Sequence, residues 1–240
     1  MLGQNYYLLT ALPGLGELGS DPPLTPRAML EMLAPATGPC ELSSVIFLSD
    51  DLQLRQAVLA GEISAEQAEP IILSAEQVRD EAPLPTSLVG EDGESDPAGQ
   101  PQLGIDRVWA MYFAHGARLA SRSEMLAEWV RYEVGLRNAL AAARAKALDL
   151  DATRYLVTPE LGYGADEYTT VLGEWSAAPN PLAGLQALDS ARWAWIGEHD
   201  GWFTFKDDEL VAYAARLVIL HRWKRIAAAQ QQQDTKTAQS

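Results

Sequence analysis

The stretch from Glu124 to Leu148 constrains the fold most, because its apolar residues recur at every third or fourth position. This spacing places them along one side of an α-helix, and that side must be buried against another element. Glu133 and Arg137 add a favourable pair four residues apart, and the alanine-rich segment 139–148 has high helix propensity. The apolar stripe consists of Trp129, Tyr132, Leu136, Leu140, Ala143 and Ala147. We therefore expect a mainly α-helical fold.

Start and stop signals predict further helices on both sides of this stretch. Thr25 stands before Pro26, which is typical of a helix start. Ser49 or Asp50 is expected to cap a helix at 48–61. The other predicted helices cover residues 26–33, 105 to a break near 121–123, 182–196 and 207–229.

Composition divides the chain into predicted lobes. Residues 81–102 are rich in proline, glycine and acid, which predicts a flexible acidic linker. It would separate an N-terminal helical lobe (1–80) from one or more C-terminal helical lobes (103–229). A low-complexity tail (230–240) is expected to be disordered. The apolar run at 6–12 could form a strand or a buried helical turn, because periodicity does not decide between them.

The charge balance limits the partners that such a chain would bind. The sequence has 33 acidic and 18 basic residues, and a net charge of −15. Phosphate backbones and anionic lipids repel such a chain, so we expect neither nucleic acid nor direct membrane insertion. The apolar runs fall short of the ~20 residues that a membrane span needs. The single cysteine, Cys40, cannot form an internal disulfide. We expect a soluble, cytoplasmic protein whose partners are other proteins.

No residue pattern in the sequence indicates a catalytic, cofactor or metal site. Gly14, Gly16 and Gly19 have the spacing of a dinucleotide-binding loop. Such a loop leads directly into a helix, whereas Ser-Asp-Pro-Pro follows Gly19, so we interpret the motif as a plain turn. The three histidines lie far apart and lack the spacing of zinc ligands. We therefore expect a protein that is not an enzyme.

Polar and aromatic residues beside the apolar stripes are the candidates for structural or interface roles. Arg55, Arg137 and Asn138 flank predicted helices, and a buried polar group needs a partner, so we interpret them as clasps that fix lobe packing. The tryptophans near the C-terminus either fill the core or mark a docking face. The candidates are Arg55, Glu133, Arg137, Asn138, Trp202, Arg222 and Trp223.

Two predicted helices share a short pattern. Residues 51–58 and 133–140 both read acid, apolar, any residue, Leu, Arg, amide, Ala, apolar. The match indicates two related helical lobes, with chance as the alternative for so short a pattern.

Three segments carry a resemblance to known families. The segment 6–13, with paired tyrosines, an apolar run and Leu-Pro, resembles the opening of a little-characterised bacterial family encoded beside V-type ATPase subunits. The segment 132–145 resembles a helix of the V/A-type ATPase C subunit, called d in eukaryotes. The segment 205–226 is similar to the terminal helix of the same bacterial family.

This resemblance implies a fold and a function. The C subunit family is built of repeated helical lobes that form a socket between the rotating central stalk and the membrane rotor ring. We therefore expect multi-lobed helical bundles and a non-catalytic subunit or accessory protein of a bacterial V/A-type rotary ATPase, peripheral to the inner membrane through the complex. The alternatives are a free-standing helical adaptor or assembly factor, and an enzyme with an unfamiliar site in the Trp-rich C-terminal section.

Overall fold

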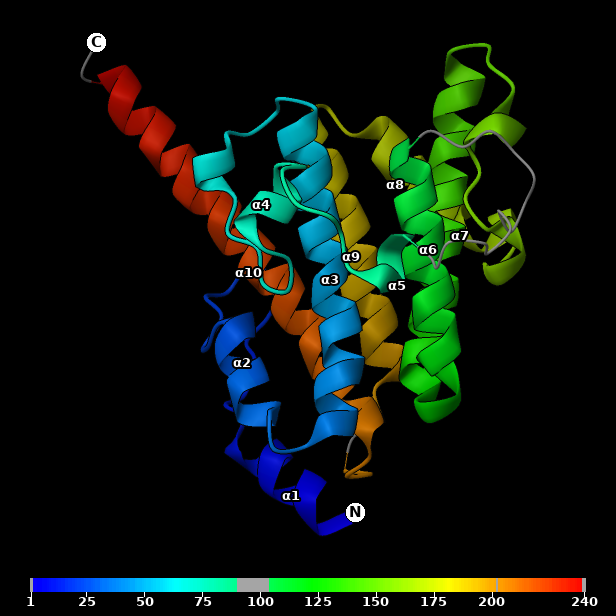
Figure 1. Cartoon of the computed structure of the whole chain (residues 1–240). Helices are drawn as coiled ribbons and strands as arrows, with labels where there is room; N and C mark the ends of the chain where they lie inside the picture. The colour runs from blue at the N-terminus through cyan, green and yellow to red at the C-terminus, as the bar shows by residue number, and fades with distance from the viewer. Residues whose placement is uncertain (1, 90–103, 202, 239–240) are drawn as a thin grey trace. The chain divides into compact units, whose positions relative to one another are not determined.

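The computed structural model describes residues 2–89, 104–201 and 203–238, and helices dominate them (Figure 1). Helix accounts for 74% of the structure, and the described residues contain no strand. The prediction of a mainly α fold is confirmed. The α-helices are α1 (Leu2–Ala11), α2 (Pro26–Leu33), α3 (Thr37–Leu59), α4 (Ala75–Val78), α5 (Thr86–Val89), α6 (Gly104–Leu119), α7 (Glu124–Ala147), α8 (Thr169–Ala177), α9 (Pro181–His199) and α10 (Asp207–Ala238).

The chain forms two compact units that differ from the predicted lobes. Unit 1 combines Met1–Phe47 with Asp189–Ser240, and unit 2 is Leu48–Leu188. The division therefore falls within α3 and α9 instead of at residues 80 and 103. Composition reports where a chain is locally polar, but it does not report which distant segments pack together, so the pairing of the two chain ends was not predicted.

Unit 1 is organised by the buried faces of α2 and α10. Thr25 accepts a hydrogen bond from the Ala28 backbone N–H at 3.1 Å, and Pro26 occupies the first turn, so the predicted start of α2 is confirmed. Residues at helical spacing on both helices are fully buried. The core includes Met29, Leu33, Leu42, Ile46, Ile196, Leu210, Ala214, Leu217 and Val218.

Unit 2 is organised by α6 and α7. The Ser123 side chain accepts a hydrogen bond from the Leu126 backbone N–H at 3.1 Å, so the predicted break and restart are confirmed. Gly135 lies against Tyr168, where an added Cβ would stand 2.3 Å from the phenol oxygen. That oxygen donates to the Tyr132 carbonyl at 2.9 Å, so a glycine is required at this position. The core includes Trp109, Tyr112, Phe113, Leu126, Trp129, Leu136 and Tyr168.

The starts of two helices differ from the predictions. The helix predicted at 48–61 begins instead at Thr37, so Ser49 and Asp50 lie within α3 and cap nothing. Pro39 lies in the first turn of α3, where proline is tolerated. The apolar run at 6–12 lies mainly in α1, so the helical alternative is correct and the strand is not, but the run is only half-buried, with Tyr6 and Tyr7 exposed.

The predicted linker and tail also differ in part from the structure. Residues 90–102 of the linker lie outside the described residues, but Thr86–Val89 forms α5, and its Leu88 is buried. Helix α10 continues to Ala238, where the sequence predicted disorder after residue 229. Alanine and glutamine favour helix, which accounts for the extension. None of the described helices is long and apolar enough to cross a bilayer.

Candidate functional site

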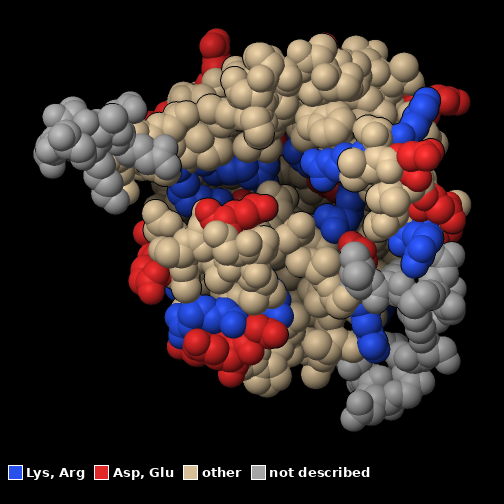
Figure 2. All heavy atoms as spheres, turned by 90° about the horizontal axis from the view of Figure 1, so that it is seen from above, with Lys and Arg blue, Asp and Glu red and all other residues tan. Residues whose placement is uncertain are grey.

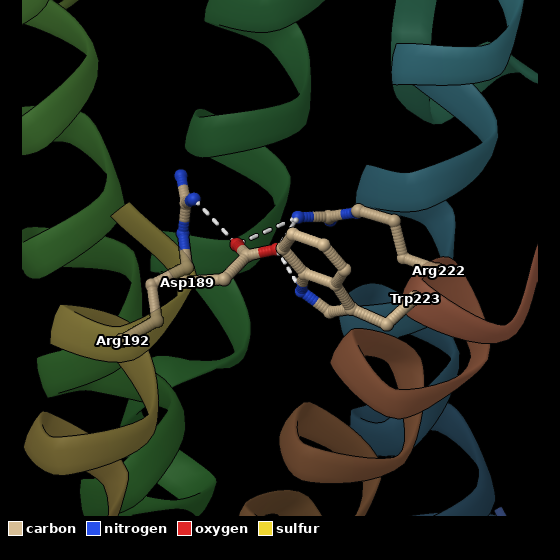
Figure 3. Close-up of polar contacts among 4 residues, drawn as sticks. All are labelled: Asp189, Arg192, Arg222 and Trp223. Atoms are coloured by element: carbon tan, nitrogen blue, oxygen red, sulfur yellow. Dashed lines mark hydrogen bonds and ion pairs between the residues drawn. The ribbon is translucent and has the colours of Figure 1, made fainter. Parts of the chain in front are cut away.

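A buried carboxylate in unit 1 gathers two of the predicted candidates (Figure 3). Asp189 on α9 is fully buried. Its Oδ1 accepts hydrogen bonds from Arg192 and Arg222, both at 2.9 Å, and its Oδ2 accepts one from the Trp223 indole N–H at 3.0 Å. Figure 3 shows that Arg192 comes from the same helix as Asp189, whereas Arg222 and Trp223 reach it from α10. We call these four residues the Asp189 clasp.

The Asp189 clasp joins α9 to α10 by electrostatics. The side chains of Arg192 and Arg222 are each only 11% exposed, so their charges are largely shielded from water. Removing one partner of a buried ion pair leaves an uncompensated charge and typically costs about 3–5 kcal/mol. The sequence analysis did not identify Asp189, although an acid inside an apolar helix with an arginine three residues later was a usable signal.

Two further candidates make polar contacts within unit 2. Arg137 donates to Asp106 at 3.3 Å, and its guanidinium lies over the Trp109 ring at 4.5 Å. Burial lowers the pKa of Arg137, and the Asp106 carboxylate acts against that shift. Asn138 donates to the Val157 carbonyl at 2.9 Å and accepts from the Val157 N–H at 2.8 Å. Arg137 thus contacts the neighbouring helix α6, and Asn138 holds the loop at Val157.

The remaining candidates do not converge on one site. Arg55 donates to the carbonyl of Gln77 and to Asp80, so it holds the end of α4. Glu133 lies near the phenol of Tyr112. The pKa of this phenol is raised mainly by the burial of Tyr112 and, to a smaller extent, by the negative charge of Glu133. Trp202 lies outside the described residues.

A second buried carboxylate, in unit 2, was missed by the sequence analysis. Asp51 is fully buried, with none of its surface accessible to water. It accepts hydrogen bonds from the backbone N–H groups of Ile71, Ile72 and Leu73 at 2.7, 2.6 and 2.7 Å. Burial raises the pKa of Asp51 to about 6, against the effect of these three donors. We call this arrangement the Asp51 anchor.

A pocket of about 570 Å³ lies within unit 1, where the two ends of the chain meet. Its walls come from α1, from the loop at 12–17, from α9, from loop residues between α9 and α10, and from the N-terminal half of α10. We call it the end pocket. Its lining residues include four aromatic side chains and four charged ones: Trp193, Phe203, Phe205, Tyr213, Glu17, Asp200, Glu209 and Arg216.

Hydrogen bonds hold the two chain ends together beside the end pocket. Asn5 donates to Asp207 at 2.6 Å, and the Tyr213 hydroxyl donates to the Pro13 carbonyl at 2.8 Å. These pairs join residues about two hundred positions apart, a contact that no local pattern could reveal. The walls of the end pocket are therefore held together by contacts between segments that are far apart in the sequence.

The glycine motif lies at the end pocket but does not make a phosphate site. Gly14 and Gly16 line the pocket, and no helix follows Gly19 until Pro26, as the sequence predicted. The pocket presents three carboxylates against one guanidinium, and Arg216 already binds Asp200. Phosphate would be repelled by this excess of negative charge.

Four aromatic rings form a strip at the end pocket; Tyr6, Tyr7 and Phe203 are exposed, and Phe205 is half-buried. The ring centroids of Tyr7 and Tyr6 lie 5.9 Å apart, those of Tyr6 and Phe205 5.2 Å, and those of Phe205 and Phe203 6.5 Å. Tyr7 is 74% exposed and Phe203 75% exposed. Large exposed aromatic groups of this kind are typical of protein interfaces. We call Tyr6, Tyr7, Phe203 and Phe205 the aromatic strip.

Charge is not concentrated on the face of the molecule that Figure 2 shows. On the face that Figure 2 shows, acidic and basic side chains lie intermixed among neutral ones. Among the described residues, no group of three or more His, Cys, Asp or Glu side chains is placed to hold a metal ion. Comparisons of the chain with protein-family models, with curated proteins and with solved structures found no match.

Proposed function

We propose that this chain is a non-catalytic subunit or accessory protein of a bacterial V/A-type rotary ATPase, and that it links the central stalk to the membrane rotor ring. One observation carries the proposal. The first and last of the segments that resemble the ATPase-associated bacterial family, 6–13 and 205–226, lie at opposite ends of the chain, yet they contact each other in unit 1. Two segments that share both a resemblance and a surface are expected to share a role.

The surface they form is suited to binding another protein. The aromatic strip belongs to these segments and the residue Phe203 beside them, and its outer rings are largely exposed. Aromatic residues bury a large area at a small cost in side-chain entropy, which makes them common anchors of interfaces. A linker between stalk and ring needs such anchors, because it works by holding two assemblies together.

The polar groups beside this surface support a mechanical role. The Asp200 carboxylate binds Arg216, and Glu209 accepts from the Phe205 N–H at 2.6 Å and the Thr204 hydroxyl at 2.8 Å. The carboxylates of Asp200 and Glu209 thus hold the backbone and side chains around the end pocket in place. The Asp189 clasp joins α9 to α10, the two helices of the same unit that flank this surface.

Affinity purification from the native host in mild detergent tests the proposal. Near-stoichiometric central-stalk and ring subunits should accompany the tagged chain, and Phe203→Ala should deplete them. Leu148→Ala is the matched control, because Leu148 is also largely exposed, at 69%, but lies in unit 2. A tagged chain that carries no rotary ATPase subunit would refute the proposal. Companions present only in assembly intermediates would favour the assembly-factor alternative.

A further inference from the structure

We infer that the end pocket and the aromatic strip together bind a basic segment of a partner protein, and that this segment inserts one large apolar side chain into the pocket. The inference rests on the proposed function only in so far as that function is docking to proteins. It does not depend on the partner being part of a rotary ATPase.

The end pocket has the size and the lining for an apolar anchor. Its volume of about 570 Å³ lies within the range of ~300–1,000 Å³ that is usual for ligand sites. Leu9, Leu12 and Leu15 form apolar parts of the wall, and Trp193 also lines it, with the Arg216 guanidinium over its ring at 5.8 Å from the centroid. Interface hot spots are found where an aromatic or aliphatic side chain fills such a pocket and excludes water.

The loop that carries Phe203 and Phe205 has an unfavourable backbone conformation at both residues. Phe203 has φ of 59° and Phe205 has φ of 55°, a left-handed conformation that is unfavourable for bulky residues. The Phe205 N–H and the Thr204 hydroxyl are held by Glu209, which stabilises this turn. Strained backbone of this kind is concentrated at binding sites, where the surrounding structure maintains it.

The charges around the pocket select a basic partner. Asp200 and Arg216 neutralise each other, which leaves Glu17 and Glu209 without a compensating cation in the pocket lining. Glu17 is exposed at the rim, so it is available to a cationic side chain. The exposed Tyr7 ring adds a face on which a lysine or arginine side chain can rest. An acidic segment would be repelled by the same groups.

Three labelled peptides test this inference on the intact chain by fluorescence anisotropy at physiological ionic strength. The first alternates Lys-Arg pairs with Leu-Trp pairs. The second replaces the basic pairs by Glu-Asp, and the third replaces the apolar pairs by Ser. We expect the first peptide to bind at least about tenfold more tightly than either of the others, because each of the others lacks one of the two required features.

Matched variants assign the binding to this surface. Phe203→Ala and Tyr7→Ala should each weaken binding of the first peptide by about tenfold, and Leu148→Ala should leave it unchanged. Glu17→Gln should weaken it by about threefold, because a rim charge contributes less. Glu160→Gln is its control, since Glu160 is exposed, lies in unit 2 and undergoes the same change of charge. Thermal melts confirm that each variant is folded.

Three results would overturn the inference. They are equal binding of all three peptides, an equal loss of affinity in the unit 2 controls, and self-association that Phe203→Ala abolishes, which would make a second copy the occupant. The peptide assay and the affinity purification fail independently. ATPase subunits in the purification without peptide binding would remove this inference and keep the proposed function. Peptide binding without ATPase subunits would do the opposite.

Discussion

Asp189 and Asp51 are both fully buried aspartates, but the protein satisfies them in opposite ways. In unit 1, two guanidinium groups and an indole surround Asp189, so a charge is balanced by charges. In unit 2, three consecutive backbone N–H groups surround Asp51, so a charge is held by dipoles alone. The first arrangement joins two helices, whereas the second fixes the loop at 71–73 against α3.

The two carboxylates have different structural roles. A buried ion pair contributes little net stability, but it is costly to break, so it specifies how two elements pack. Buried backbone N–H groups without an acceptor are costly. A carboxylate that accepts from them therefore determines where the loop lies. Unit 1, which carries the proposed docking surface, contains the buried ion pairs, whose disruption costs more free energy.

The largest effect is expected from removing the charge of Asp189. Asp189→Asn should lower the free energy of unfolding by about 3–5 kcal/mol, because both guanidinium groups would remain buried without their carboxylate. Urea denaturation measures this loss. Asp80→Asn is the control: the Asp80 side chain is 65% exposed, so its pair with Arg55 should account for less than about 1 kcal/mol. Equal losses in the two variants would contradict the special role of Asp189.

The next largest effect is the dependence of the Asp51 contribution to stability on pH. Because burial raises the pKa of Asp51 to about 6, the folded state favours the neutral carboxyl, and its contribution to stability is present at low pH and lost as pH rises from about 4 through 6. The stability advantage of the native chain over Asp51→Asn should therefore shrink over this range, by on the order of 3 kcal/mol.

Urea denaturation of both proteins between pH 4 and pH 8 measures this change. The difference between the two proteins reports on Asp51, because the substitution removes only this carboxyl group. An advantage that grows with pH would show that the three N–H donors outweigh burial at this site.

A smaller effect is expected from removing the Asn138 side chain, a neutral amide that binds the backbone of a loop. Asn138→Ala should lower the free energy of unfolding by about 1–3 kcal/mol, because the N–H and carbonyl of Val157 would both lose their partner. The loss should be independent of pH between 5 and 8, unlike that of Asp51→Asn. Thermal or urea unfolding of the variant measures it. A pH-dependent loss would mean that a titrating neighbour, and not the amide, is responsible.

The smallest effect is expected at the C-terminal end of the chain. Removing residues 230–240 should leave the urea midpoint of the rest unchanged, because the described side chains at 230–232 are exposed and the core of α10 ends earlier. A clear fall in the midpoint would show that this part of α10 packs against the protein.

The sequence predicted what depends on local spacing. The helix after the break at 121–123 and the Thr25 start of α2 follow from local patterns, and both are present. Of the predicted stripe on α7, Trp129, Tyr132, Leu136 and Leu140 are buried, whereas Ala143 is half-buried and Ala147 is exposed near the end of the helix. Arg222 and Trp223 were named as candidates, but their partner Asp189 lies 33 and 34 residues away, outside any local pattern. The end pocket was missed for the same reason, since its walls come from both chain ends. Only the packing of unit 1 brings them together.

Photocrosslinking from the aromatic strip in the native host tests the central claim most directly. A photoreactive amino acid replaces Phe203 in one strain and Leu148 in another, and mass spectrometry identifies the proteins joined after irradiation. We predict adducts with rotary ATPase subunits from position 203, joined through a segment rich in lysine and arginine, and none from position 148. Adducts with unrelated proteins only, or the same adducts from both positions, would contradict the account.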